Sequence, residues 1–237
     1  MIWTYWWSYI IIVPGILLAI FAQAMVTRAY GRYSKITAQS GWTADAIAER
    51  LLRENGCGVR IAQIRGNLTD NYNPSTKVLS LSESCYGRRD IAALGVAAHE
   101  VGHAVQDAKN YFPLRLRSML VGVVNFGSRL AFPLLLIGIL LEVFFVQNPQ
   151  VGNFVITLAI ISYSLATVFS LITLPVEFNA SKRALRMLSD SGALNSEELA
   201  GARKVLNAAA MTYVASMLTS LLYLLRFIII ASRFRRK

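Results

Sequence analysis

Four long apolar stretches divide the chain, over residues 6–26, 130–146, 151–174 and 211–231. A helix needs about 20 apolar residues to cross the hydrocarbon core of a bilayer, so each stretch is a candidate membrane segment. The second is the shortest, and it can be extended backward to begin near Met119. Only the four residues 147–150 separate the second stretch from the third. We therefore predict that these two form an antiparallel helical hairpin.

The polar region after the first stretch contains two predicted helices. Thr43 is a plausible N-cap for a helix that buries Ile47 and Leu51 and stops at Asn55 and Gly56. Residues 90–108 have apolar residues at helical spacing and predict a second, longer helix. Within it, glycines at 95 and 102 weaken helix propensity, which indicates close approach by another element.

The same region contains two predicted strands. Residues 59–64 are apolar enough for a strand, and residues 77–82 alternate in the manner of a second one. The intervening sequence Asn-Tyr-Asn-Pro at 71–74 is typical of a turn. The polar region is therefore predicted to be an α+β lobe with a sheet of few strands.

Composition and charge agree with a membrane protein. The chain has 237 residues, 55% of them hydrophobic, and 24 Lys and Arg against 13 Asp and Glu, for a net charge of +11. The cations flank the apolar stretches and no nucleic-acid-binding motif accompanies them, so we expect a lipid bilayer and no nucleic acid as partner. Cys57 and Cys85 share no metal-binding or paired spacing and are predicted to be free thiols.

The distribution of cations predicts an orientation. Residues 28–117 contain 13 Lys and Arg and residues 176–210 contain five, whereas the turn near Asn148 contains none. The positive-inside rule then places the lobe on the cytoplasmic side of the membrane, with the N-terminus on the outer side. A fourth crossing would carry the basic residues after 232 outside. Either the last helix lies on or re-enters the inner surface, or the rule fails at the tail.

These patterns divide the chain into five segments. They are an N-terminal membrane anchor (1–27), the cytoplasmic lobe (28–117), a transmembrane hairpin (118–175), cytoplasmic helices (176–210), and a C-terminal membrane-associated helix with a basic tail (211–237). The prediction is an α+β, mostly α, membrane protein with about four membrane-embedded helices.

One motif carries recognisable chemistry. The chain's two histidines, His99 and His103, flank Glu100 in an HExxH sequence within the predicted helix 90–108. Histidines four residues apart share a helix face, so both imidazoles can bind one tetrahedral Zn²⁺. The intervening glutamate is then placed to act as general base toward a water on the metal.

The third protein ligand must be a carboxylate or a thiolate, because the chain has no other histidine. Asp107 is one turn too far along the helix, and Glu142 lies inside the second membrane segment. Glu177 is the best candidate, since it follows Pro175, where a membrane helix is expected to end and a cytoplasmic helix to begin. The alternative role for Glu177 is that of an acid stabilising the first turn of that helix.

With these residues identified, the chain resembles the YugP-type neutral zinc metallopeptidase family of bacterial membrane proteins over nearly its whole length. Four segments carry the resemblance: residues 66–74, 79–82, 91–106 with the HExxH, and 176–181. The layout is similar to the larger HtpX and CAAX-prenyl-protease group, where a glutamate in an E-x-x-x-D pattern is a metal ligand. The resemblance implies a zincin-like catalytic lobe, one zinc ion per chain and Glu177 as third ligand.

Three positions depart from the family pattern. Ser181 stands where the larger group has Asp, and Asn71 and Asn73 stand where YugP-type relatives are expected to have His and Asp. Zinc peptidases of this layout commonly hold the substrate along a sheet edge, for which the candidate is 77–82, with Lys77, Leu79 and Leu81. The alternative is a plain edge strand. Candidate donors to the oxyanion of the tetrahedral intermediate are Tyr72 and Tyr86.

These observations predict a membrane-bound, gluzincin-like zinc metalloendopeptidase acting on proteins or peptides near the cytoplasmic membrane face. One alternative is a non-catalytic scaffold or partner-binding protein with a structural zinc. Such a site needs no base and usually has four protein ligands, so Glu100 argues against it. A cation transporter is a third class, disfavoured because the HExxH lies in the polar lobe.

Overall fold

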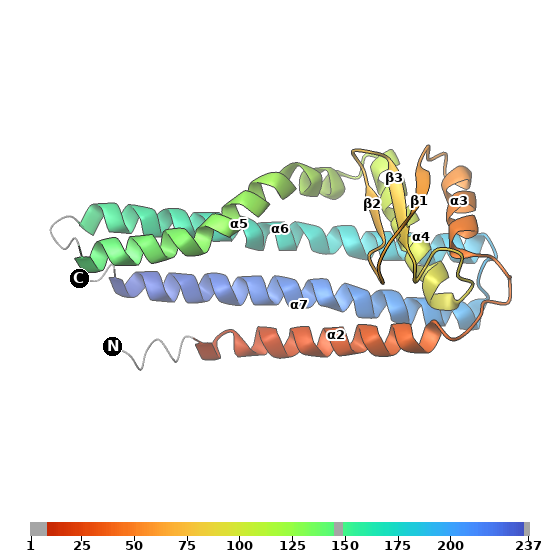
Figure 1. The fold of residues 1–237 in the computed structure, drawn as a ribbon, viewed down its shortest axis with the longest axis horizontal. Coiled ribbons are helices and arrows are strands. Elements are labelled where there is room, and N and C mark those ends of the chain that lie inside the picture. Colours follow the sequence, from red (N-terminus) through yellow and green to blue (C-terminus); the bar gives the residue numbers. More distant parts are fainter. Residues whose placement is uncertain (1–8, 145–148, 235–237) are drawn as a thin grey trace. The chain divides into compact units, whose positions relative to one another are not determined.

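The computed structural model describes residues 9–144 and 149–234 of the chain. Its main elements are α2 (Val13–Tyr33), α3 (Ala44–Glu54), β1 (Arg60–Ile64), β2 (Asn71–Asn73), β3 (Val78–Ser82), α4 (Ile91–Ala108), α5 (Phe112–Phe144), α6 (Pro149–Asp190) and α7 (Ser196–Phe234). They form two compact units, which we call the bundle (1–21, 116–173 and 213–237) and the lobe (22–115 and 174–212). The predicted α+β, mostly helical fold is confirmed (Figure 1).

Among the described residues, four helices are long and apolar enough to cross a membrane: Val13–Tyr33, Phe112–Glu142, Gln150–Asp190 and Ser196–Ser232. Each contains or overlaps one predicted apolar stretch. The second begins well before residue 130, in line with the backward extension. Residues 6–8 of the first stretch, residues 145 and 146 of the second, and residues 147 and 148 of the turn lie outside the described part of the chain.

The bundle contains the predicted antiparallel hairpin. A Cβ added to Gly138 of α5 would meet Ile156 of α6, and one added to Gly152 of α6 would meet Glu142 of α5. The residue number of the contact increases from 138 to 142 in α5 while it decreases from 156 to 152 in α6, so the two helices run antiparallel. Small residues at these positions let the backbones approach, as is common between membrane helices.

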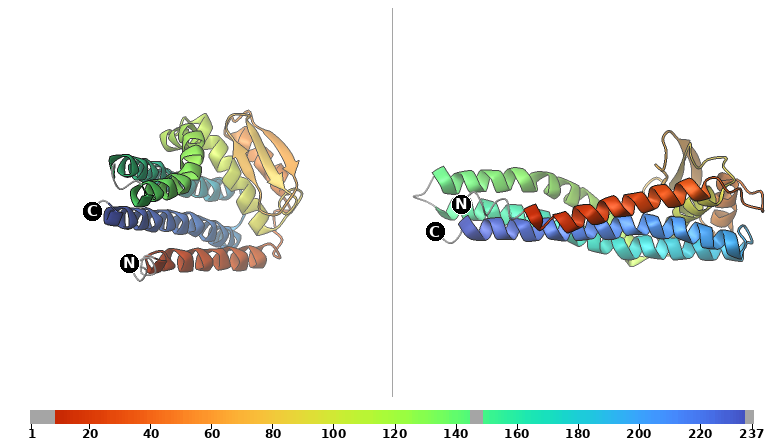
Figure 2. Two further views of the ribbon diagram at one scale, coloured as in Figure 1. Left: turned by 60° about the vertical axis from the view of Figure 1, so that its left-hand side comes forward. Right: turned by 90° about the horizontal axis from the view of Figure 1, so that it is seen from below.

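The α7 helix packs lengthwise inside the bundle. Its Ser220 hydroxyl lies 2.9 Å from that of Thr167 on α6, and its Phe227 ring is 4.9 Å from the ring of Tyr163. Gly15 of α2 faces Thr219 of α7, and Figure 2 shows these two helices side by side. A helix packed against two others along its length favours a crossing over a position on the membrane surface.

The expectation that a membrane helix ends at Pro175 is wrong, because α6 continues through this residue to Asp190. Proline lacks one N–H and disturbs one turn of a helix, but it does not end a helix that is held by packing on both sides. Val176 and Ala180, directly after the proline, are fully buried. Their burial stabilises the helix where the hydrogen bond is missing.

The lobe has a three-stranded sheet in the order β1-β3-β2, and two predictions about it are wrong. Residues 78–82 of the segment predicted as an edge strand at 77–82 form the central strand, because β1 pairs with β3 in parallel and β2 pairs with it antiparallel. Residues 71–73, expected in a turn, form β2, and the turn follows at 74–77. The side chain of Asn73 stabilises this turn by accepting hydrogen bonds from the backbone N–H groups of Ser75 and Thr76.

Both predicted lobe helices form with the expected caps. The Thr43 hydroxyl accepts a hydrogen bond from Ala46 N, and α3 ends before Asn55 and a left-handed Gly56. Asp90 caps α4 by accepting from Ala93 N at 3.0 Å. The two helices pack together under the sheet, with side chains buried from α3, β3 and α4: Ile47, Leu51, Leu79, Leu81, Leu94, Val101 and Val105.

Helix α4 crosses α6 at very close range. A Cβ built on Gly102 would lie 2.6 Å from the carbonyl oxygen of Ala180, and one on Gly95 would lie 3.4 Å from the Cβ of Ala202 on α7. Real Cβ atoms do not approach a backbone oxygen so closely. The close approach that the two glycines predicted is confirmed, and it brings the HExxH face of α4 onto α6.

We predict that Gly102→Ala destabilises the protein by about 1–3 kcal/mol, since the added methyl forces α4 and α6 apart in a packed region. Thermal unfolding of the purified full-length protein measures the effect. Gly31→Ala in α2 is the matched control, because its Cβ would meet nothing within 4 Å. An unchanged midpoint for Gly102→Ala would show that the helices are not in contact here.

Candidate metal centre

Three side chains from two elements of the lobe converge at one point. His99 and His103 lie one turn apart on α4, and Glu177 lies on α6 two residues after Pro175. One ligand atom from each lies within 4.8 Å of the others, and all three side chains are largely shielded from solvent. The structure thus brings together the three residues selected from the sequence.

The separations in this cluster suit a tetrahedral ion. Glu177 Oε2 lies 3.2 Å from His99 Nε2 and 3.5 Å from His103 Nε2. Two ligand atoms that each lie about 2.0–2.1 Å from a tetrahedral zinc are separated by about 3.4 Å. The imidazole rings are 4.7 Å apart and nearly perpendicular, with an interplanar angle of 87°. The donor set and its spacing fit zinc.

Hydrogen bonds on the other ring nitrogens orient both imidazoles. Ser181 Oγ lies 3.2 Å from His99 Nδ1, and Gln106 Oε1 lies 3.0 Å from His103 Nδ1. Such contacts fix the ring and its tautomer, and thereby the nitrogen that faces a metal. Ser181, at the position where the E-x-x-x-D pattern has aspartate, therefore contacts His99 through its hydroxyl.

The tautomer of His103 follows from the partners of Gln106. The Gln106 amide nitrogen donates to the carbonyl oxygen of Val176 at 2.8 Å and to Asn179 Oδ1 at 3.0 Å. Because a carbonyl only accepts, the NH₂ group must face Val176 and the amide oxygen must face His103. His103 Nδ1 then carries a proton, which leaves Nε2, on the side of Glu177, as the nitrogen that can bind a metal.

Electrostatics inside the cluster favour a bound cation. Burial raises the pKa of Glu177, but hydrogen bonds from His103 and His99 outweigh it and hold that pKa far below the ordinary range. Burial alone would lower the pKa of His103. The hydrogen bond to Glu177 and the negative charge of Glu100 outweigh burial, so the pKa of His103 is raised. The metal-free site therefore compensates its buried carboxylate with imidazole protons, which a metal ion would displace.

Glu100 lies between the two histidines in sequence and is 8% exposed. Burial raises its pKa, opposed by the charges of His103 and His99. A raised pKa makes a carboxylate a better proton acceptor at neutral pH, and a neighbouring dication acts against the rise. Glu100 is thus a buried acid with no position in the three-ligand cluster.

The other residues selected from the sequence lie elsewhere. Leu79 and Leu81 are fully buried core residues of β3, so they cannot line a substrate edge. Tyr72 donates its hydroxyl hydrogen to Asp107, and this bond and burial raise its pKa, so the phenol is engaged away from an oxyanion. Lys77 also pairs with Asp107, and Tyr86 is exposed.

Asparagines 71 and 73 have local structural roles on β2. The amide of Asn71 donates to Thr69 O at 2.9 Å, and Asn73 forms the turn described above. Cys57 and Cys85 are both free thiols, as predicted. Gln106 was not selected as a site residue, and the signal that could have found it is its place three residues after His103, on the same helix face.

Comparison with known proteins agrees with this geometry. The family model described as "Putative neutral zinc metallopeptidase" matches residues 8–232. The "Putative membrane protease YugP" of Bacillus subtilis (strain 168) is 46% identical over 215 residues, which cover 90% of this chain and 91% of that protein. No solved structure gives a significant match.

We predict that Gln106→Leu weakens zinc binding by about 10–100-fold, the usual cost of losing an outer hydrogen-bond partner of a ligand. Leucine fills a similar volume but leaves His103 Nδ1 without an acceptor. Competition with a chelator of known affinity measures the dissociation constant. Gln63→Leu, on the exposed side of β1, is the control, and an equal effect of both variants would refute the assigned role.

Proposed function

The chain belongs to the neutral zinc metallopeptidase family, and on this basis we propose that it is a membrane-bound zinc-dependent endopeptidase. The observation that carries the proposal is the convergence of His99, His103 and Glu177 on one point. Glu100 is positioned by the same turn of α4. In this proposal the first three residues hold one Zn²⁺, and Glu100 is the catalytic base.

The chain's own residues would divide the work of peptide hydrolysis. A zinc ion at the cluster would supply Lewis acidity, which polarises a peptide carbonyl and lowers the pKa of water to about 7. Glu100 takes a proton from the attacking water and returns it to the departing amine. Ser181 and Gln106 hold the two imidazoles in the orientation that this requires.

A structural zinc site is the alternative, and the donor set disfavours it. The cluster offers three protein ligands in the described part of the chain, whereas structural zinc usually has four. Cys85, a buried free thiol of the lobe, donates its hydrogen to Ala93 O. Three ligands and an adjacent buried carboxylate are the pattern of a hydrolytic site.

We place the lobe on the cytoplasmic side of the cytoplasmic membrane. The two lobe segments counted in the sequence contain 18 of the 24 Lys and Arg residues, from 13 and five. The helices α2, α5, α6 and α7 each join the lobe to the bundle, so four crossings return the chain to the outer side. The basic end of α7 then lies outside, an exception to the positive-inside rule that the lobe outweighs.

A catalytic site that is anchored beside a membrane acts on the substrates that can reach the membrane surface. The exposed apolar residues of the bundle, such as Phe126, Phe132 and Phe154, suit lipid contact and anchor the catalytic lobe to the bilayer. We therefore propose membrane-associated proteins or peptides as the substrate class.

We predict that Glu100→Gln lowers the hydrolysis of casein by about 10²–10⁴-fold while one zinc per chain is retained, because the amide cannot accept the water's proton. Glu177→Ala removes both the activity and the metal. Metal content and peptidase assays are measured on the same purified samples.

Glu49→Gln, an exposed glutamate on α3, is the matched control and keeps both properties. Full activity in Glu100→Gln would contradict the role of the base. A zinc-loaded wild type without activity on protein or peptide substrates would favour the structural-zinc scaffold.

We predict that alkaline phosphatase fused after Lys237 is active, because the end of α7 lies outside the cytoplasm and this enzyme folds only in an oxidising compartment. A fluorescent protein that matures only in the cytoplasm stays dark at the same position. The reverse pattern would overturn the proposed orientation without affecting the metal site.

A further inference from the structure

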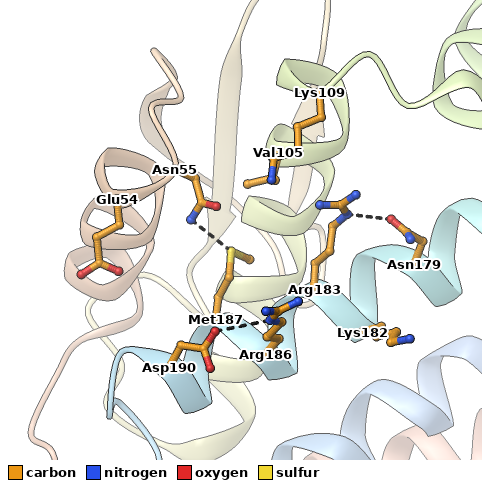
Figure 3. Close-up of a pocket in the computed structure, with 10 residues that line it drawn as sticks. All are labelled: Glu54, Asn55, Val105, Lys109, Asn179, Lys182, Arg183, Arg186, Met187 and Asp190. Carbon is orange, nitrogen blue, oxygen red and sulfur yellow. Dashed lines mark hydrogen bonds and ion pairs between the residues drawn. The ribbon is translucent and has the colours of Figure 1, made fainter.

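A second site lies in the lobe, apart from the metal cluster. An open cavity of about 540 Å³ is lined by the end of α3, the end of α4 and the last part of α6, as Figure 3 shows. Its charged lining side chains are Lys109, Lys182, Arg183, Arg186, Glu54 and Asp190. Four cations against two acids leave an excess of two positive charges around a space that can hold a ligand.

The lining acids do not neutralise these cations. Arg186 Nε lies 3.5 Å from Asp190 on the same helix, while Glu54 pairs with Arg50, which does not line the cavity. No carboxylate in the described part of the chain lies within ion-pair distance of Lys109, Lys182 or Arg183. Three lining cations therefore remain available to an anion.

Arg183 is prepared to bind an anion. Its Nε donates to Asn179 Oδ1 at 2.7 Å, a contact drawn as a dashed line in Figure 3. A guanidinium anchored through Nε keeps both terminal nitrogens, which form the fork that matches phosphate or carboxylate oxygens. The anchor also reduces the side-chain entropy that binding would otherwise cost.

The same anchor connects the cavity to the metal cluster. Asn179 Oδ1 accepts from Arg183 and also from the amide nitrogen of Gln106, whose oxygen accepts from His103 Nδ1. Each link is a hydrogen bond whose direction is fixed, because Arg183 only donates. An anion that holds Arg183 in place also holds Asn179 and Gln106 in the arrangement that orients His103.

We propose that this cavity binds the phosphate group of a phosphate monoester or of a phospholipid, and that its occupancy strengthens metal binding at His103. The excess of positive charge suits an anionic phosphate group, and the space exceeds that of inorganic phosphate. Val105 and Met187 line the cavity as well and offer an apolar surface to an organic substituent. Phosphate binding does not depend on the proposed peptidase activity, whereas its coupling to the metal rests on the proposed zinc site.

Isothermal titration of the full-length protein in neutral detergent with inorganic phosphate tests the site. The expected result is one phosphate per chain, with an affinity about tenfold weaker in Arg183→Gln and in Lys109→Gln. Arg89→Gln is the matched control, because Arg89 is exposed, lines no part of this cavity and carries the same charge.

Two results would overturn the site. One is no heat of binding to the wild type at phosphate concentrations up to about 10 mM, where a site with a dissociation constant near 1 mM would be largely occupied. The other is an equal loss in Arg183→Gln and Arg89→Gln, which would show that phosphate follows net charge and not the cavity.

Nanodiscs distinguish the two sources of the phosphate group. If the ligand is a phospholipid, discs of phosphatidylglycerol abolish the binding of added phosphate and discs of phosphatidylcholine preserve it. If the ligand is soluble, both discs preserve it. Either pattern supports the site, and abolition by both lipids contradicts it, since the cavity would then admit lipid without selecting anionic phosphate.

The coupling is tested by reciprocity. If phosphate strengthens zinc binding, zinc strengthens phosphate binding by the same factor, and we expect at least threefold tighter phosphate binding to zinc-loaded than to metal-free protein. Asn179→Ala should bind phosphate more weakly, because Arg183 loses its anchor, and should bind it equally with and without zinc. Equal affinities in the wild type would overturn the coupling while leaving the phosphate site and the peptidase proposal separately testable.

Discussion

The close crossing of α4 over α6 is the constraint on which the lobe's chemistry depends. At Gly102 the α4 backbone has no side chain between it and the carbonyl of Ala180. This contact sets the distance between the two helices, and so between the histidines of one and Glu177 of the other. A larger residue at 102 would separate a donor set whose members must lie within about 3.4 Å to share a tetrahedral ion.

A hydrogen-bond network continues from the metal cluster across this crossing. The Gln106 oxygen faces His103 Nδ1, and its amide nitrogen donates to Val176 O and Asn179 Oδ1 of α6. Asn179 also accepts from Arg183, which lines the cationic cavity. One pair of helices thus positions both the metal ligands and the residues that orient them.

Local features of the fold and the site could be predicted from the sequence. The predictions that Thr43 caps a helix and that residues 90–108 form a helix with the HExxH on it depend only on neighbours within a few residues. The structure confirms both elements. The choice of Glu177 depended on an expected helix boundary at Pro175 that does not exist, although Glu177 does join the cluster. The structure therefore brings Glu177 to the two histidines, although the helix boundary used to select it is absent.

Features set by distant contacts could not be predicted in the same way. With residues 71–74 taken as a turn, the predicted strand at 77–82 had only one neighbour and was assigned to the edge. In the structure β2 pairs with its other side, so β3 lies in the centre of the sheet. Gln106 was overlooked because its role depends on Val176 and Asn179, 70 and 73 residues away. Tyr72 was chosen for its chemistry, but its hydroxyl is committed to Asp107.

X-ray absorption at the zinc edge of the purified, zinc-loaded protein tests the central claim most directly. The account predicts four-coordinate zinc with only nitrogen and oxygen neighbours at about 2.0–2.1 Å, and with the outer-shell scattering of two imidazoles. Sulfur at about 2.3 Å, or a shell without imidazole, would contradict the assignment of His99, His103 and Glu177 as the metal ligands.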